Sequence, residues 1–128
     1  MQRSQVAKLV SDFAKQHQVA LFSKTWCPFC AKVKNLFESH NVKYEAYELD
    51  KIPEADCEMI QDHLKEVTGI RSVPNVWLNG SFAGDSSKMM ELAEQRKLFK
   101  MISNHEFDYR QIEKFSKFRK QFQNFANF

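Results

Sequence analysis

The hexapeptide TWCPFC at residues 25–30 places two cysteines three positions apart, directly after the short apolar run of residues 19–22. This order predicts a buried strand followed by a helix that begins near Cys27, because Pro28 suits the first turn of a helix. That turn leaves backbone N–H groups unpaired and carries the positive end of the helix dipole. A thiol placed there loses its proton more readily, and the thiolate is its reactive form. Cys30 lies one turn further on, so the pair is interpreted as redox-active.

The length and the cysteine content bound the class of protein. The chain has 128 residues, which predicts one domain, and its three cysteines are too few for a disulfide scaffold. One C-x-x-C pair near a strand–helix junction indicates redox chemistry in a reducing compartment. No run is long enough for a membrane span, and the first residues lack the apolar core of a secretory signal. We therefore expect a cytoplasmic protein whose first residues form an amphipathic helix of the fold itself.

The formal net charge of +3 is unevenly distributed. Residues 110–128 contain five basic residues and one acidic residue, a local charge of +4, which leaves −1 for residues 1–109. The basic character therefore belongs to the end of the chain, and we expect no nucleic-acid partner.

Apolar periodicity and turn residues predict four helices and four strands. The helices are expected over residues 3–17, from 27 with Val33, Leu36 and Phe37 inward, from 53 to Gly69 with Ile60, Leu64 and Val67 inward, and from 84 through 102. The strands are expected over residues 19–22, 44–49, 76–78 and 81–83, the last two joined by Asn79-Gly80. The first two strands are connected through a helix and should be parallel. The result is an α/β fold with a small mixed sheet and helices on its faces.

Several separated motifs occur together in this sequence. They are Lys24-Thr25 before the cysteine pair, Gln61, the segment Arg71-Ser72-Val73-Pro74-Asn75-Val76, Asn79-Gly80 and Gly84-Asp85. In this combination the chain resembles a dithiol glutaredoxin over about residues 3–102. The resemblance implies a thioredoxin-like three-layer fold with a four-stranded mixed sheet. It also implies a glutathione-dependent oxidoreductase that reduces protein–glutathione mixed disulfides and protein disulfides.

The resemblance further implies roles for individual residues. Cys27 resembles the nucleophile, and Cys30 resembles the thiol that resolves the mixed disulfide. Glutathione is implied as co-substrate, with glutathionylated or disulfide-bonded proteins as partners and no metal. The implied glutathione site comprises Lys24, Phe29, Gln61, Val73, Pro74, Gly84, Asp85 and Ser86. In it Lys24 would favour the thiolate and meet a carboxylate of glutathione, Pro74 would follow a cis bond, and residues 84–86 would begin a helix whose amides hold the γ-glutamyl carboxylate.

The segment expected to bind the γ-glutamyl end departs from the family pattern. The usual pair of glycines reads Ala83-Gly84, and Ser86 and Ser87 replace the usual acidic residues. An acid there would pair with the ammonium group of glutathione, and Asp85 offers a carboxylate only at a shifted position. We therefore expect weaker or altered γ-glutamyl contacts.

Other interpretations of the cysteines were weighed against this one. A zinc site needs four ligands, and only Cys57 and His63 lie nearby in the sequence, so zinc is not expected. An iron–sulfur-cluster-carrying or adaptor glutaredoxin is the alternative function, although Pro28 stands where cluster-binding members mostly have glycine or serine. A thioredoxin-like reductase is disfavoured because the cysteines do not enclose Gly-Pro. Cys57 is expected to be a partly exposed spare thiol, with a regulatory or dimerising role left open, and Trp26 a surface aromatic.

Residues 105–128 extend beyond the glutaredoxin-like domain expected over residues 1–104. They contain six of the twelve phenylalanines, and on a helix Phe115, Phe118, Phe122 and Phe125 would form one stripe beside several basic residues. We expect an extra C-terminal helix that docks on the domain. Contact with a partner's groove, contact with a membrane surface and self-association are alternatives that the sequence leaves open.

Overall fold

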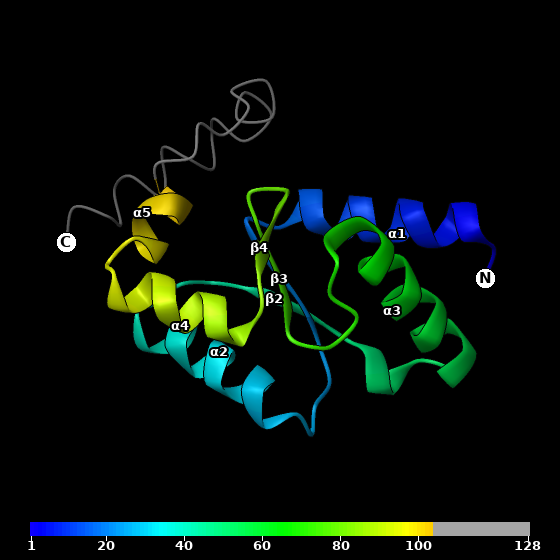
Figure 1. The fold of residues 1–128 in the computed structure, drawn as a ribbon, viewed down its shortest axis with the longest axis horizontal. Helices are drawn as coiled ribbons and strands as arrows, with labels where there is room; N and C mark the ends of the chain where they lie inside the picture. The colour runs from blue at the N-terminus through cyan, green and yellow to red at the C-terminus, as the bar shows by residue number, and fades with distance from the viewer. Residues whose placement is uncertain (104–128) are drawn as a thin grey trace, which may run out of the picture.

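A four-stranded sheet with helices on both faces forms the part of the chain that the computed structural model describes, residues 1–103 (Figure 1). The helices are α1 (Arg3–Gln16), α2 (Pro28–Ser39), α3 (Glu54–Thr68), α4 (Ser86–Glu94) and α5 (Leu98–Ser103), with a 3₁₀ turn η1 (Leu49–Lys51). The strands are β1 (Val19–Ser23), β2 (Glu45–Glu48), β3 (Asn75–Leu78) and β4 (Ser81–Gly84). This is the mixed sheet with helices on its faces that the order of elements predicted, and the thioredoxin-like architecture that the resemblance implied.

The sheet is mixed, with the strand order β2-β1-β3-β4. The central strand β1 pairs in parallel with β2 and antiparallel with β3, and β3 pairs antiparallel with β4. The turn between β3 and β4 has positive φ angles at Asn79 (54°) and Gly80 (83°). These angles suit the tight hairpin that an Asn-Gly pair predicts, because their twist matches that of the flanking strands. The parallel pair and the hairpin are therefore both confirmed.

Each face of the sheet has its own hydrophobic core. Helices α1 and α3 cover one face, where the buried side chains are Val6, Val10, Phe22, Leu49, Cys57, Ile60 and Leu64. Helices α2, α4 and α5 cover the other face, over Val19, Leu21, Val33, Phe37, Val76, Leu78, Met89, Leu92, Leu98 and Ile102. Successive residues of a strand point to opposite faces, so β1 contributes to both cores and is buried throughout. Its carboxyl end is thus held firmly where it leads into residues 24–27.

Two details differ from the elements expected. The helix predicted from residue 84 through 102 is interrupted after Glu94, where Arg96 adopts a left-handed φ of 59° and the N–H of Lys97 bonds the carbonyl of Leu92 at 2.9 Å. Helices commonly end at a residue with left-handed backbone angles, which is usually glycine or asparagine. An arginine at this position does not predict a helix end from sequence. Val67 was expected to face inward and is 53% exposed, because the last turn of α3 runs beyond the core.

The predicted C-terminal helix over residues 105–128 lies outside the described residues, and its docking stays a prediction. Among the helices of residues 1–103, none has both the length and the apolar content of a membrane-spanning segment.

Candidate active site

The first cysteine of the pair caps the N-terminus of α2. Cys27 has an extended backbone, and its Sγ atom accepts the N–H of Cys30 at 3.4 Å. Its own N–H donates to the carbonyl of Lys24 at 3.1 Å, which closes the turn between β1 and the helix. A helix N-terminus favours negative charge at this position, through unpaired N–H groups and the dipole. The sulfur atom is therefore placed where a thiolate is stabilised.

The second cysteine lies inside the protein. Cys30 is fully buried, whereas Cys27 is 7% exposed, and both are free thiols. Burial, together with a hydrogen bond to Cys27, raises the pKa of Cys30 from 9.0 to about 11. Hydrogen bonds with the backbone of Lys24 and with the hydroxyl of Ser23 lower this pKa, but they oppose the shift only in part. At neutral pH Cys30 therefore keeps its proton, which suits a thiol that acts second.

The segment of residues 73–74 faces the nucleophile from across the sheet. The peptide bond between Val73 and Pro74 is cis, as the resemblance implied. The thiol of Cys27 points at the carbonyl oxygen of Val73, with 3.9 Å between sulfur and oxygen. Val73 is half-buried and Pro74 buried, so the backbone of Val73 borders the sulfur atom. An extended substrate backbone laid along this segment would pass close to Cys27.

Buried polar side chains hold this segment in place. The amide of Asn75, fully buried, donates to the hydroxyl of Thr68 and to the carbonyl of Ile70, both at 3.3 Å. The indole N–H of Trp77 donates to the remaining oxygen of Asn75 at 2.8 Å. Buried polar groups are costly unless they are paired, so this network fixes the loop before β3. Asn75 belongs to the motif noted in the sequence, but its buried hydrogen bonds to Thr68, Ile70 and Trp77 were not expected, because no sequence pattern indicates which side chains pair there.

Gln61 was expected to contact glutathione, and the structure directs its amide inward. The side chain is 6% exposed, donates to the carbonyl of Arg71 at 3.0 Å and accepts from the thiol of Cys57 at 3.3 Å. Its observed contacts thus support the loop that leads to Val73, and direct contact with glutathione stays a prediction. Cys57 was expected to be partly exposed, which is wrong: it is buried at 7% exposure in the core under α3.

The start of α4 places the three residues expected at the γ-glutamyl end. Gly84 pairs with Val76 in the sheet, which brings it beside the segment that follows Pro74. Its φ of 143° and the approach of Lys88 leave no room for a side chain. The carboxylate of Asp85 accepts the N–H of Lys88 at 3.0 Å and so caps the helix. Ser86 is the first residue of α4, and its contact with a ligand stays a prediction.

Lys24 and Phe29 border the nucleophile at its solvent side. The Nζ atom of Lys24 lies 5.6 Å from the ring centroid of Trp26. Phe29 is 56% exposed, with the Nζ atom of Lys32 at 5.5 Å from its ring centroid. Both residues are close neighbours of Cys27 in the sequence, and their contact with glutathione stays a prediction.

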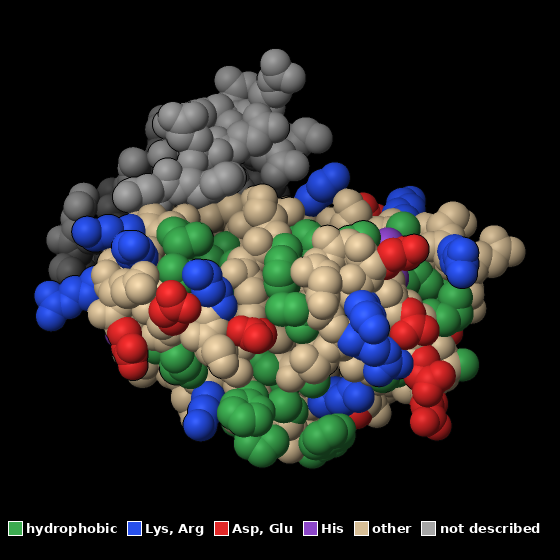
Figure 2. Space-filling model, in the orientation of Figure 1, with side chains coloured by type: hydrophobic (Ala, Val, Ile, Leu, Met, Phe, Trp, Pro, Cys, Tyr) green, Lys and Arg blue, Asp and Glu red, His purple; other side chains and the backbone are tan. Residues whose placement is uncertain are grey.

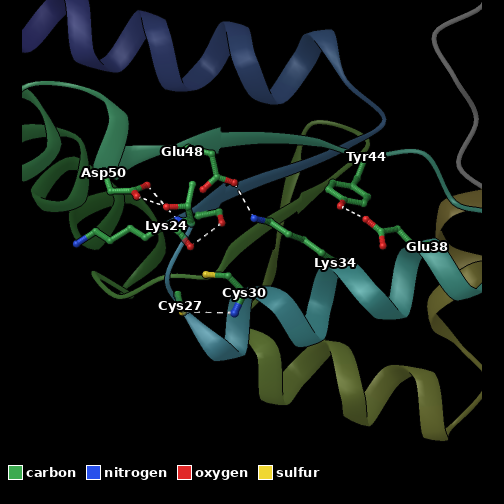
Figure 3. A network of polar contacts seen from close by, with 10 residues as sticks. Lys24, Cys27, Cys30, Lys34, Glu38, Tyr44, Glu48 and Asp50 are labelled. Carbon is green, nitrogen blue, oxygen red and sulfur yellow. Dashed lines mark hydrogen bonds and ion pairs between the residues drawn. The ribbon is translucent and has the colours of Figure 1, made fainter.

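Asp50, from η1, holds the loop that precedes Cys27 (Figure 3). Its carboxylate accepts the N–H of Thr25 at 3.0 Å and also the hydroxyl of Thr25. These hydrogen bonds lower the pKa of Asp50, since they favour its charged form. Nearby, Lys34 forms an ion pair with Glu48 at 2.7 Å between nitrogen and oxygen. Thr25 belongs to the motif around the cysteines, but its link to Asp50 and the pair of Lys34 with Glu48 were not expected, because these partners lie 25 and 14 residues apart along the chain.

No group of three or more histidine, cysteine, aspartate or glutamate side chains suited to a metal ion is found within residues 1–103. The expectation that zinc is absent stays a prediction.

A thiol at a strand-to-helix junction, a second buried thiol one turn on and a cis-proline segment opposite define a thiol–disulfide oxidoreductase of the thioredoxin fold. Comparison with known proteins is more specific. The glutaredoxin family model matches residues 19–83. Glutaredoxin-C2 of Arabidopsis thaliana is 37% identical over 92 residues, which cover 72% of this chain and 81% of that protein. The mitochondrial glutaredoxin-2 of Bos taurus is 38% identical over 93 residues, 73% of this chain and 58% of that protein.

A solved structure agrees with these relatives. The crystal structure of a buckwheat glutaredoxin–glutathione complex has a TM-score of 0.75 and 31% sequence identity, with 80% of this chain and 91% of that chain covered. The chain therefore belongs to the glutaredoxin family. It is a glutathione-dependent thiol–disulfide oxidoreductase, with glutathione as its co-substrate.

Proposed function

We propose that the protein reduces protein–glutathione mixed disulfides and protein disulfides, with Cys27 as the nucleophile and Cys30 as the resolving thiol. The observation that carries the proposal is the contrast between the two thiols. The sulfur of Cys27 caps α2 and faces Val73, whereas Cys30 is fully buried and keeps its proton. One thiol is thus placed to attack first and the other to attack afterwards.

The reaction divides into two exchanges of sulfur–sulfur bonds. The thiolate of Cys27 attacks the glutathionyl sulfur of the substrate, the substrate's disulfide breaks, and the protein thiolate leaves and takes a proton from water. Cys27 then carries glutathione as a mixed disulfide. The thiolate of a second glutathione attacks the bound glutathionyl sulfur, which frees Cys27 and forms glutathione disulfide. Each substrate thus consumes one free glutathione, whose sulfur is oxidised to the disulfide as the protein sulfur is reduced to a thiol.

Protein disulfides require the second cysteine. Cys27 attacks one sulfur of the substrate and forms a mixed disulfide with it. Cys30 loses its proton and attacks the sulfur of Cys27, which expels the second substrate thiol and leaves a disulfide between Cys27 and Cys30. Two glutathione molecules reduce that disulfide again. The structure supports this step because Cys30 lies one helical turn from Cys27 and donates its backbone N–H to the Cys27 sulfur.

Glutathione would lie along the segment of residues 73–74, with its cysteinyl backbone beside Val73 and its sulfur at Cys27. The side chains and backbone proposed to hold it are those of Lys24, Phe29, Gln61, Val73, Pro74, Gly84, Asp85 and Ser86. Support is strongest for Val73, whose carbonyl lies at the sulfur, and for Gly84, which the sheet places beside the same segment.

The test is the turnover of a small glutathione mixed disulfide, coupled to glutathione reductase, with and without glutathione. We expect turnover that requires glutathione and that disappears in Cys27→Ser. Cys57→Ser is the matched control, because it makes the same atomic change at a buried thiol and keeps a donor for Gln61. Loss of turnover in Cys57→Ser alone, or turnover without glutathione, would contradict the proposal.

We also propose a cytoplasmic location. Because one relative is named as a mitochondrial glutaredoxin, fractionation of cells into cytosol and mitochondria is the direct test.

A further inference from the structure

Two aromatic rings stand in solvent on either side of the buried nucleophile. Trp26 is 68% exposed and Phe29 is 56% exposed, while Cys27 between them is 7% exposed. They are two of five large hydrophobic side chains that are exposed within residues 1–103, the others being Met1, Val67 and Met101. No core contact explains their position, since both rings flank the one atom that must meet a substrate. Exposed apolar side chains that cluster at one place mark an interaction surface.

Each ring has a lysine over it. The Nζ atom of Lys24 lies 5.6 Å from the centroid of Trp26, and that of Lys32 lies 5.5 Å from the centroid of Phe29. Neither lysine forms an ion pair with any carboxylate in the described residues, whereas Lys34 on the same helix is paired with Glu48. Because Lys24 is proposed to meet glutathione, the charge of Lys32 is the one that remains available to a protein partner.

The rings and the lysines form one surface around the mouth of the site. Figure 2 shows hydrophobic side chains gathered at the edge of the molecule where β1 leads into α2, with basic side chains on both sides of them. Glutathione is a small tripeptide that occupies the side toward Val73, so it does not need Trp26 or Lys32. A surface that is apolar at its centre and positive at its rim matches a protein segment with the opposite rim charge.

We propose that Trp26 and Lys32 form a docking surface for the protein half of the mixed disulfide, and that this surface selects cysteines flanked by acidic side chains. The inference rests on the proposed function and specifies its substrate class. An apolar residue of the substrate would lie on Trp26, and a carboxylate would meet Lys32. The preference acts on encounter and binding of the substrate protein, because neither side chain touches the reacting sulfur atoms.

The experiment compares two short peptides that each carry one glutathionylated cysteine. In one peptide glutamates flank the cysteine, and in the other glutamines take their places. A small glutathione mixed disulfide serves as the third substrate. For the parent protein at low salt we expect kcat/KM to be about two- to fivefold higher for the acidic peptide, the range that one exposed ion pair supplies. High salt should remove the difference.

Three variants assign the effect to the surface. Lys32→Gln should bring the two peptides to equal kcat/KM and leave the small substrate unchanged. Lys8→Gln removes the same charge from an exposed site on α1 and should keep the preference. Trp26→Ala should raise KM for both peptides by about three- to tenfold, with the small substrate unchanged, because the ring contributes apolar contact.

The outcomes separate the inference from the proposed function. Absence of turnover of the small substrate by the parent would refute the proposed function, and the inference with it. Normal turnover of the small substrate with equal rates for the two peptides would overturn the inference alone, as would equal losses in Lys32→Gln and Lys8→Gln. A dimer in solution that Trp26→Ala dissociates would assign the surface to a second copy of the chain and also overturn it.

Discussion

At the scale of single residues, the site depends on the different environments of two chemically identical side chains. Cys27 and Cys30 are three residues apart, yet Cys27 caps a helix and is 7% exposed, whereas Cys30 is fully buried. Burial raises the pKa of Cys30 to about 11, so that its thiol stays protonated while Cys27 reacts. This difference in environment is the basis for the proposed order of the two chemical steps.

The raised pKa of Cys30 predicts how stability depends on pH. The folded protein holds this proton more tightly than the unfolded chain, in which the pKa is 9.0. The stabilisation is complete below pH 9.0 and is lost as pH rises from there through about 11. The melting temperature of the reduced parent should therefore fall more steeply across this range than that of Cys30→Ser. The pKa of Tyr44, raised to about 12, affects both proteins alike. Parallel melting curves would contradict the assignment.

The serine at residue 86 leads us to expect weaker glutathione binding than an acidic residue would give. Residues 86 and 87 are serines where an acid is expected to pair with the ammonium group of glutathione, and the Asp85 carboxylate already caps α4. Ser86→Asp should therefore lower the KM for glutathione by about two- to fivefold, the range of one exposed ion pair. Ser86→Asn supplies a side chain of the same size without the charge and is the control. Equal KM values in the parent and Ser86→Asp would contradict this interpretation.

At the scale of elements, the passage from β4 to α4 requires glycine at residue 84. A Cβ atom built there would lie 2.6 Å from the Cβ of Lys88, and φ is 143°. Gly84→Ala should therefore cost roughly 3 kcal/mol of stability in denaturant unfolding. Gly69 also has positive φ, 83°, but open space around it, so Gly69→Ala should cost only roughly 1 kcal/mol. A smaller cost at Gly84 than at Gly69 would show that the start of α4 can move aside.

The hydrogen bonds between Asp50 of η1 and Thr25 of the loop before α2 predict that substitutions of these two residues have coupled effects on activity. Asp50 holds both the N–H and the hydroxyl of Thr25, next to Lys24. Asp50→Asn and Thr25→Val should each lower kcat/KM about three- to tenfold, because the loop loses its orientation, and the double variant should lose no more than either alone. Asp12→Asn, at an exposed site on α1, is the control. Losses that multiply in the double variant would show that the two residues act independently.

Local sequence patterns predicted most of the helices and strands, but they could not predict the side-chain contacts between those elements. Asn79-Gly80 and Gly69 marked the hairpin and the end of α3, because backbone angles there depend on the residue itself. Arg96 gave no such sign of the break between α4 and α5. The cysteine pair located the site, since its chemistry depends on neighbours in sequence. The bond from Asp50 to Thr25 joins residues 25 positions apart, which only the fold brings together, and the bond from Asn75 to Thr68 depends on the shape of the loop between α3 and β3.

At the scale of the whole molecule, the sheet separates two cores and presents the reactive sulfur at one end. There Cys27, at the start of α2, lies against the carbonyl of Val73 in the loop before β3, and Gly84, just before α4, pairs with Val76 of β3 (Figure 1). The two cores lie on opposite faces of the sheet that carries these segments. Atoms from the start of α2 and from the loop before β3 thus meet at Cys27.

The most direct measurement of the central claim is the mass of two variants after reaction with a glutathionylated peptide in the absence of free glutathione. Cys30→Ser should gain one glutathione, mapped to Cys27, and release one equivalent of peptide thiol. Cys27→Ser should gain none and release none. When glutathione is added, Cys30→Ser should turn over the mixed disulfide while Cys27→Ser stays inactive. Glutathione found on Cys30, or equal labelling and turnover in the two variants, would contradict the roles assigned to the two cysteines.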